Sequence, residues 1–415
     1  MTMQNVLLFD QSVHYGEVIR HWRKEVIKCT ASSLLEVYNE TFGTEYSKRW
    51  WERMEKNNKL PTDIDRRLVI AAMLNIPFTD LGIRLPPRGR ERPLIPLLTE
   101  ETLIDVSDYR KRLALLWSSK YDKPQEAIKR INLLDDAFHY GPGSDRPQVA
   151  ALLAEYLLFY SNIERNFACF SSAFHMANKA LKVVDSSAMP YITAKAHYMQ
   201  GYATYERWHA SSQRDPETLR RVVADMGKAS IFLKEAKPSE GTSSLGAAIL
   251  ELWAGSAIHL AQDLKDKSLS LDKIKLAARV LTSAERVILP DPFFFKIDQN
   301  WLHIGRARAL IAAKDPNSAL AELGKVPSGN VKKLRRFLTA AIVEAEAYRA
   351  MDKIDMAAAY TLAALETAKE LKADLHIARI DALCRDMRSE EKYQSSPELM
   401  RLGVAIVKAQ YPDFF

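Results

Sequence analysis

The segment 84–98 most constrains the fold, because it interrupts a chain that otherwise favours long helices. It has the sequence Arg-Leu-Pro-Pro-Arg-Gly-Arg-Glu-Arg-Pro-Leu-Ile-Pro-Leu-Leu, with four prolines and a glycine. Proline lacks the backbone N–H donor and has a fixed φ, so this segment cannot continue a helix. We therefore predict an interdomain linker at 84–98, between one domain at 1–83 and a second at 99–415.

The scarcity of glycine predicts the class of both domains. The chain has 415 residues and only 15 glycines, about half the usual ~7% share. Glycine serves tight turns and hairpins, so a chain with few glycines and many Ala-rich stretches is predicted to be all-α. A composition of 47% hydrophobic and 27% charged residues excludes collagen-like and wholly disordered chains. The net charge of +7 permits a nucleic-acid partner without requiring one.

The compartment is predicted from what the sequence lacks. It has no uncharged apolar stretch long enough to span a membrane, and residues 1–10 are too short and too weakly basic for a signal peptide. The three cysteines, Cys29, Cys169 and Cys384, are odd in number and far apart. They favour buried free thiols over a disulfide framework or a Cys-rich metal site. We therefore expect a cytoplasmic protein without a membrane partner.

Three short helices are predicted in the first domain, over 17–28, 33–41 and 46–55. Thr30 and Ser32 are suitable N-caps for the second helix, and Gly43 ends it and supplies the turn. In the third helix, Tyr46, Trp51 and Met54 are predicted to point inward. The outward face is then rich in long hydrogen-bond donors, and a short turn before such a helix is typical of a helix-turn-helix.

Residues 51–61, Trp-Glu-Arg-Met-Glu-Lys-Asn-Asn-Lys-Leu-Pro, resemble the end of the recognition helix in Cro/lambda-repressor-type (XRE) DNA-binding domains. The segment 65–77 is similar to the closing helix of that family, and the match covers roughly residues 16–82. Asn57 stands where the family usually has glycine, and asparagine tolerates the left-handed conformation. Ser32 and Ser33 stand where a glutamine commonly begins the second helix.

The resemblance implies roles for the outward-facing residues. Arg49 would contact guanine in the major groove, and a Ser32 hydroxyl beside a helix N-terminus would bind a phosphate. Two other interpretations stay open, namely an ordinary solvated basic face and a degenerate helix-turn-helix used for protein contacts. Residues 1–92 hold 15 Lys and Arg against 12 Asp and Glu, a small excess. The predicted base-reading residues are Ser47, Lys48, Arg49 and Glu52, and the predicted phosphate-binding residues are Ser32, Arg53, Lys56 and Lys59.

The second domain contains repeated small residues at helical spacing. The pattern Trp301-x-x-Ile304-Gly305 resembles the tetratricopeptide (TPR) signature, in which a small residue lets two helices pack closely. Several such units recur at intervals of about 34–50 residues, a range typical of helical repeats. We predict a TPR-like α-solenoid with a continuous core and a concave surface. The residues that fit the repeat spacing include Ser161, Ala173, Ala177, Ala180, Gly201, Gly255, Ala277, Leu281, Ala284, Ala345, Ala357, Thr361 and Ala364.

The concave surface of such an array is predicted to bind an extended peptide. Amide groups pair with a peptide backbone, and aromatic rings pack its side chains. The other interpretation is ordinary interhelical packing, in which Tyr198, Tyr202 and Tyr205 belong to the core. The predicted peptide-binding residues are Asn162, Arg165, Asn166, Tyr198, Tyr202, Gln299, Arg306 and Arg349.

We find no sequence motif for catalysis. The P-loop, dinucleotide-binding, zinc-protease and nucleophile-elbow motifs do not occur, and no two histidines are spaced to hold a metal from one helix. We therefore expect a protein that is not an enzyme and needs no cofactor or metal.

An XRE-type domain followed by a TPR array resembles the RRNPP group of peptide-responsive transcription factors. The resemblance implies a cytosolic, homodimeric regulator that binds double-stranded DNA and senses a short peptide of the quorum-sensing type. The alternative from another class is a TPR adaptor or scaffold protein, whose helix-turn-helix domain makes protein contacts. The sequence does not give the operator, the peptide or the sign of regulation.

Overall fold

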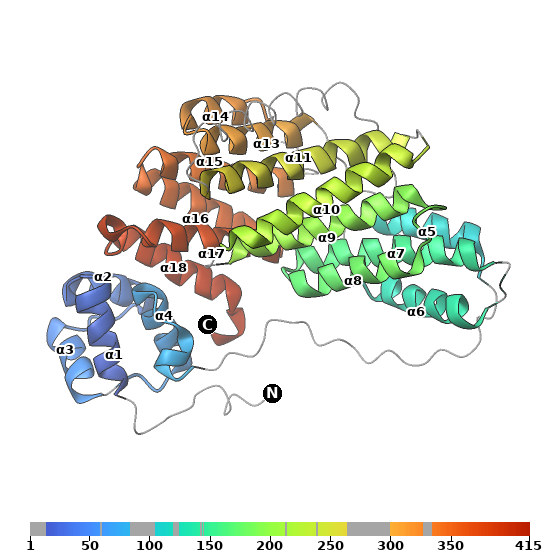
Figure 1. Cartoon of the computed structure of the whole chain (residues 1–415). Helices are drawn as coiled ribbons and strands as arrows, with labels where there is room; N and C mark the ends of the chain where they lie inside the picture. The colour runs from blue at the N-terminus through green and yellow to red at the C-terminus, as the bar shows by residue number, and fades with distance from the viewer. Residues whose placement is uncertain are drawn as a thin grey trace. The chain divides into compact units, whose positions relative to one another are not determined.

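The computed structural model describes residues 14–58, 60–83, 104–118, 124–141, 143, 145–211, 214–237, 240–263, 299–326 and 334–415. Within these ranges every regular element is a helix, which confirms the all-α class (Figure 1). None of the described helices is long and apolar enough to cross a bilayer. The chain folds into two compact units, Met1–Arg90 with Glu344–Phe415, and Glu91–Val343.

The two units divide the chain differently from the predicted domains. The sequence assigns all of 99–415 to one domain, whereas the structure groups Glu344–Phe415 with the N-terminal helices. The physical reason is a shared apolar core, to which Met400 and Val404 from the C-terminal end contribute together with N-terminal residues. The predicted linker at 84–98 lies outside the described residues.

The first unit is built from both ends of the chain. Its first helix continues from an α-helix directly into a π-helical turn. In chain order its helices are α1 (Tyr15–His21), η2 (Trp22–Val26), α2 (Ala31–Phe42), α3 (Lys48–Asn57), α4 (Ile64–Leu74), η3 (Phe78–Leu81), α16 (Ile354–Glu370), α17 (Asp374–Arg388), η5 (Glu391–Tyr393), α18 (Pro397–Gln410) and η6 (Pro412–Phe414).

Local sequence signals set the ends of the N-terminal helices. The Thr30 hydroxyl accepts a hydrogen bond from the Ser33 backbone N–H at 3.1 Å, so of the two predicted N-caps it is Thr30 that caps α2, and the helix begins at Ala31, two residues earlier than predicted. Gly43 ends α2 in the left-handed conformation, with φ 61°. After α3 the left-handed residue is Asn58, with φ 52°, one position later than the sequence suggests, and Asn57 is the last helical residue.

The second unit is an array of consecutive helices. Its core includes Tyr156, Phe159, Ala177 and Leu219. The helices are α5 (Val106–Ser118), α6 (Pro124–Tyr140), α7 (Arg146–Asn166), α8 (Phe170–Val183), α9 (Pro190–Ala210), α10 (Pro216–Glu235), α11 (Glu240–Asp263), α13 (Gln299–Ala312) and α14 (Pro316–Leu323), and the unit boundary falls within α15 (Leu334–Ala350).

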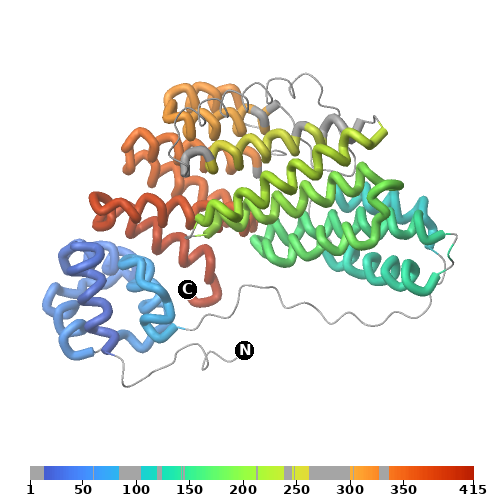
Figure 2. The backbone as a smooth tube through the Cα atoms, in the orientation of Figure 1, coloured from blue at the N-terminus to red at the C-terminus, as the bar shows by residue number. Residues whose placement is uncertain are grey.

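Small residues lie where neighbouring helices of the array meet. From α6 to α11 each helix packs against the next one along the chain (Figure 2). The Ser161 hydroxyl of α7 donates to the Ala173 carbonyl of α8 at 2.7 Å. A Cβ atom on Gly201 of α9 would lie 2.5 Å from the terminal methyl group of Met226 of α10, so a larger residue would require the Met226 side chain to move. Close packing of this kind supports helical hairpins, whereas the assignment to TPR repeats stays a prediction. Ala277, Leu281 and Ala284 lie outside the described residues.

Candidate nucleic-acid interface

The turn between α2 and α3 is organised by the side chain of Asn39. Its amide nitrogen donates to the Tyr46 carbonyl, and its oxygen accepts from the Tyr46 N–H, both at 3.0 Å. The same oxygen accepts from the Thr44 hydroxyl at 3.0 Å. One side chain therefore fixes both sides of a five-residue turn and sets the direction in which α3 begins. Asn39 is not among the residues predicted from the sequence, although an asparagine just before a glycine turn is a recognisable signal.

Helix α3 has one buried and one exposed face. Trp51 and Met54 are buried as predicted, at 0% and 2% exposure, and Glu55 is buried beside them at 5%. Tyr46, which precedes the helix and was predicted to point inward, is only half-buried. Lys59 lies outside the described residues. The residues predicted to contact DNA are all exposed, namely Ser32 on α2, Ser47 at the N-cap of α3, and Lys48, Arg49, Glu52, Arg53 and Lys56 on α3.

The exposed face of α3 carries four cations and one acid. Lys48 Nζ lies 3.8 Å from the Glu52 carboxylate, and both side chains are more than half exposed. A surface pair of this kind contributes about 0–1 kcal/mol and yields easily to a stronger partner. Arg53 donates from Nε to the Arg49 carbonyl at 3.2 Å, which directs its side chain along the helix. The face therefore offers a net positive charge on long side chains.

A buried ion pair holds the inner face of α3 against the first helix. Arg23 donates from Nε and Nη2 to the two oxygens of Glu55, both at 2.7 Å, and the two side chains are 9% and 4% exposed. Trp51 Nε1 donates to the same carboxylate at 2.8 Å. The hydrogen bond to Glu55 raises the pKa of the Arg23 guanidinium, which stays charged. Paired, planar hydrogen bonds define an orientation as well as an energy, so this pair fixes the rotation of α3.

The end of α3 is also held by the start of α1. The Gly16 N–H donates to the Asn58 side-chain oxygen at 2.8 Å. A Cβ atom at Gly16 would lie 2.4 Å from the Glu55 carbonyl oxygen, so the two backbones approach as closely as glycine allows. Sequence patterns contain no signal for this contact or for the Arg23–Glu55 pair, because both join residues far apart in the chain.

An aromatic cluster supports the beginning of α3. The Tyr46 and Trp50 rings are stacked, with centroids 4.2 Å apart and planes 13° apart. The Arg66 guanidinium of α4 lies 5.2 Å from the Phe42 ring centroid and donates to the Tyr46 hydroxyl at 3.0 Å. Trp50 is half-buried, so part of its ring borders the exposed face that carries Arg49. This cluster makes the N-terminal turn of α3 a rigid platform.

In the second unit, the residues predicted to bind a peptide are buried rather than accessible. Arg165 of α7 donates to the Asn162 oxygen at 2.8 Å, and its guanidinium lies 4.2 Å from the centroid of the Tyr202 ring of α9. It also lies 3.7 Å from the Glu206 carboxylate, which is fully buried. These polar groups contact one another between α7 and α9, which corrects the prediction that they line an open surface. The side chains of Asn162, Arg165, Asn166, Tyr198 and Tyr202 are each at most 8% exposed.

The other predicted peptide-binding residues make separate ion pairs. Arg306 lies 3.4 Å from Glu322, which also accepts from His303 at 2.6 Å and from Lys325 at 2.5 Å. Burial raises the pKa of Glu322, but these hydrogen bonds outweigh it and lower the pKa to about 2.

Arg349 belongs to the first unit, where its guanidinium lies 3.9 Å from Asp386 and 3.8 Å from Glu390. Gln299 begins α13, and its side chain lies outside the described part of the structure. The predicted residues on α7 and α9 therefore lie together in one cluster. Arg306 and Arg349 lie elsewhere and pair with Glu322 and with Asp386 and Glu390, respectively.

Among the described residues, no group of three or more His, Cys, Asp or Glu side chains is arranged to hold a metal ion. Comparison with known proteins gives no relative. No protein-family model matches the chain, and neither a curated protein nor a solved structure matches it. A function is therefore inferred from the residues themselves.

Proposed function

We propose that this protein is a cytoplasmic, DNA-binding transcriptional regulator whose helical array controls DNA binding. The observation that carries the proposal is α3, a helix with Ser47, Lys48, Arg49, Arg53 and Lys56 exposed on one face. Its opposite face is fixed by the Arg23–Glu55 pair. A helix that follows a short turn and presents long donors suits the major groove, where arginine pairs with guanine through two hydrogen bonds.

Regulation by a short peptide is the second part of the proposal. It rests on the helical array alone and has no assigned binding site, because Asn162, Arg165 and Asn166 are buried and contact one another. A peptide-gated switch requires that the peptide bind one state of the protein more tightly than another. A homodimer would place two α3 helices on two half-sites of an operator.

Selection of bound duplexes from a random pool by the full-length chain tests the first part. The expected result is enrichment of one sequence with two related half-sites about one helical turn, or a multiple of it, apart. The affinity should fall steeply with salt, because Lys and Arg that neutralise phosphates release counterions. A pool without enrichment, together with a protein partner recovered through the array, would instead favour an adaptor.

A further inference from the structure

The C-terminal end of α4 is held by a side chain from the other end of the sequence. Arg388, the last residue of α17, donates from Nη1 to the Ala72 carbonyl at 2.6 Å and from Nη2 to the Met73 carbonyl. The final carbonyls of a helix lack partners within the helix and carry the negative end of its dipole. A guanidinium satisfies both requirements, with two donors and a positive charge.

The contact between α17, α18 and α4 is buried and close. Arg388 is 4% exposed. A Cβ atom at Gly403 of α18 would lie 3.1 Å from the Ala72 carbonyl oxygen and 3.2 Å from Arg388 Nη1, so glycine leaves room for the guanidinium and for the end of α4. If α4 separated from α17, the buried Arg388 guanidinium would lose its two carbonyl partners. Because a buried charge without partners is costly, this contact favours the packed state of the two helices.

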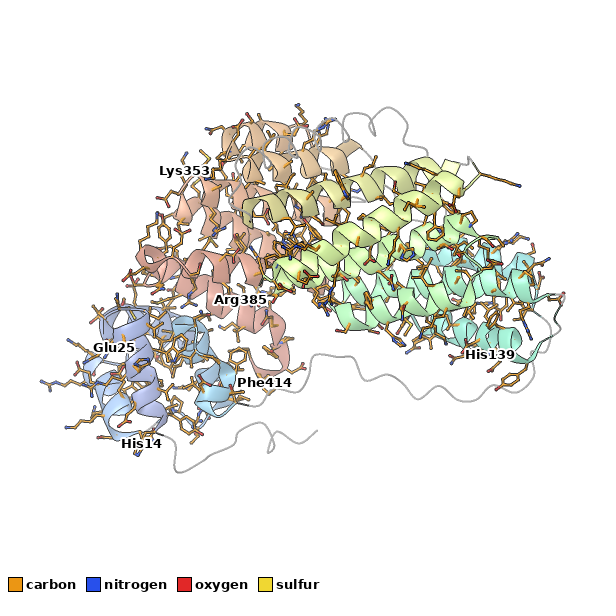
Figure 3. The ribbon with its side chains drawn as sticks, viewed as in Figure 1. His14, Glu25, His139, Lys353, Arg385 and Phe414 are labelled. Carbon is orange, nitrogen blue, oxygen red and sulfur yellow. The ribbon has the colours of Figure 1, made fainter. Side chains whose placement is uncertain are left out.

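Apolar side chains of α18 continue the core of the helix-turn-helix. Met400, Val404 and Val407 are at most 5% exposed and belong to the same cluster as Leu34 of α2 and Leu68 of α4. Further along, Phe414 is partly buried against this core (Figure 3). The removal of α18 would therefore expose an apolar surface on both α2 and α4 to water.

Charged pairs at the rim set the position of α18. Arg401 lies 2.7 Å from the Glu40 carboxylate and 2.9 Å from the Glu36 carboxylate, so one guanidinium spans one turn of α2. Lys28, which follows η2, pairs with Glu391 of η5. Each exposed pair contributes little energy, but together they specify one register between the two chain segments.

From these contacts we propose that residues 344–415 are an obligate internal partner of the helix-turn-helix domain. The domain is made from two separate segments of the chain, and these segments stay associated even when the covalent connection between them is cut.

A cut in the full-length chain tests the proposal. A protease site is inserted between Arg90 and Glu91, the cut protein is passed over a size-exclusion column, and the fractions are separated under denaturing conditions. The expected result is that the fragment 1–90 elutes together with 91–415. Elution of the two fragments in separate native peaks would overturn the proposal. The result does not depend on DNA, so a failure of the proposed function appears separately, as an uncut chain that does not bind DNA.

A pair of matched variants assigns the interaction to Arg388. In the cut protein, Arg388→Met should weaken the association of the fragments on the order of 10- to 100-fold, because two buried carbonyls lose a charged donor. Lys369→Met is the control, since Lys369 is an exposed cation of the same chain segment whose ion pair at 2.9 Å is with Glu366 of its own helix, α16. The control should associate like the wild type. Equal association of the Arg388→Met and Lys369→Met proteins would overturn the role given to Arg388.

Discussion

The two predicted binding regions present their polar side chains in opposite ways. On α3 every residue predicted to contact DNA is exposed, whereas on α7 and α9 every residue predicted to contact a peptide is buried. A surface such as that of α3 is ready to bind without rearrangement. The cluster of Arg165 and Glu206 is instead occupied by its internal contacts. On the proposed function, only the surface of α3 is open to a partner as it stands.

Each region also contains a buried arginine–glutamate pair, and the two pairs differ in geometry. Arg23 and Glu55 make two parallel hydrogen bonds of 2.7 Å. Arg165 and Glu206 are 3.7 Å apart, and Arg165 shares its donors with Asn162. The first pair therefore holds α3 through two parallel hydrogen bonds, whereas Arg165 divides its contacts between Asn162, Glu206 and the Tyr202 ring. The following variants test this comparison.

The largest effect is expected for Glu55→Gln. The variant leaves the buried Arg23 cation without its carboxylate, which should cost about 3–5 kcal/mol. Hydrogen exchange of the α1 and α3 amides measures the opening of this unit alone. Glu52→Gln is the matched control, because Glu52 is exposed on the same helix, and it should change the opening free energy by about 0.5 kcal/mol or less. Equal effects of the two variants would show that the pair does not support α3.

A smaller effect is expected for Arg165→Met. The variant removes the charged donor to Asn162 and the cation beside the buried Glu206, at a cost of about 1.5–3 kcal/mol. Hydrogen exchange of the α7 and α9 amides gives this value. Arg207→Met, on the exposed face of α9, is the control and should leave the exchange unchanged. A cost as large as that of Glu55→Gln would remove the proposed difference between the two pairs.

The array should also respond to pH through Asp225 of α10. Burial raises the pKa of Asp225 to about 6, whereas the unfolded carboxyl has a pKa of about 3.9. Between these values the folded chain holds a proton that the unfolded chain has lost. The free energy of unfolding should therefore fall by about 2 kcal/mol as the pH rises from about 4 to about 6. Chemical unfolding of the wild type and Asp225→Asn at both pH values checks this, and parallel pH profiles would contradict it.

Local patterns were enough to predict the helical class and the two ends of α2. Thr30 and Gly43 act on their own neighbours, so their roles follow from residue type. The alternation of buried and exposed residues on α3 follows from the helical period in the same way. The sequence therefore predicted the exposed face that carries Arg49, although it did not show what fixes that face.

Long-range contacts were not predictable from the same patterns. Arg388 and Ala72 are far apart in the sequence, and nothing near either residue indicates that a guanidinium will end α4. The burial of Asn162 and Arg165 depends on a neighbouring helix that supplies Glu206 and Tyr202. Sequence periodicity indicates the faces of a helix, but the neighbour that covers a face is set by tertiary packing.

The central claim, that α3 reads DNA sequence, is tested most directly by the ratio of the affinities for a selected and a scrambled duplex. The full-length chain is titrated with its selected duplex and with a scrambled duplex at fixed salt, and the ratio of the two affinities is compared among variants. Arg49→Ala should lower this ratio about 10- to 100-fold, because a two-hydrogen-bond contact to guanine discriminates by about 1–3 kcal/mol. Arg53→Ala should weaken both duplexes alike, as a phosphate contact does. An Arg49→Ala protein with the wild-type ratio would contradict the account.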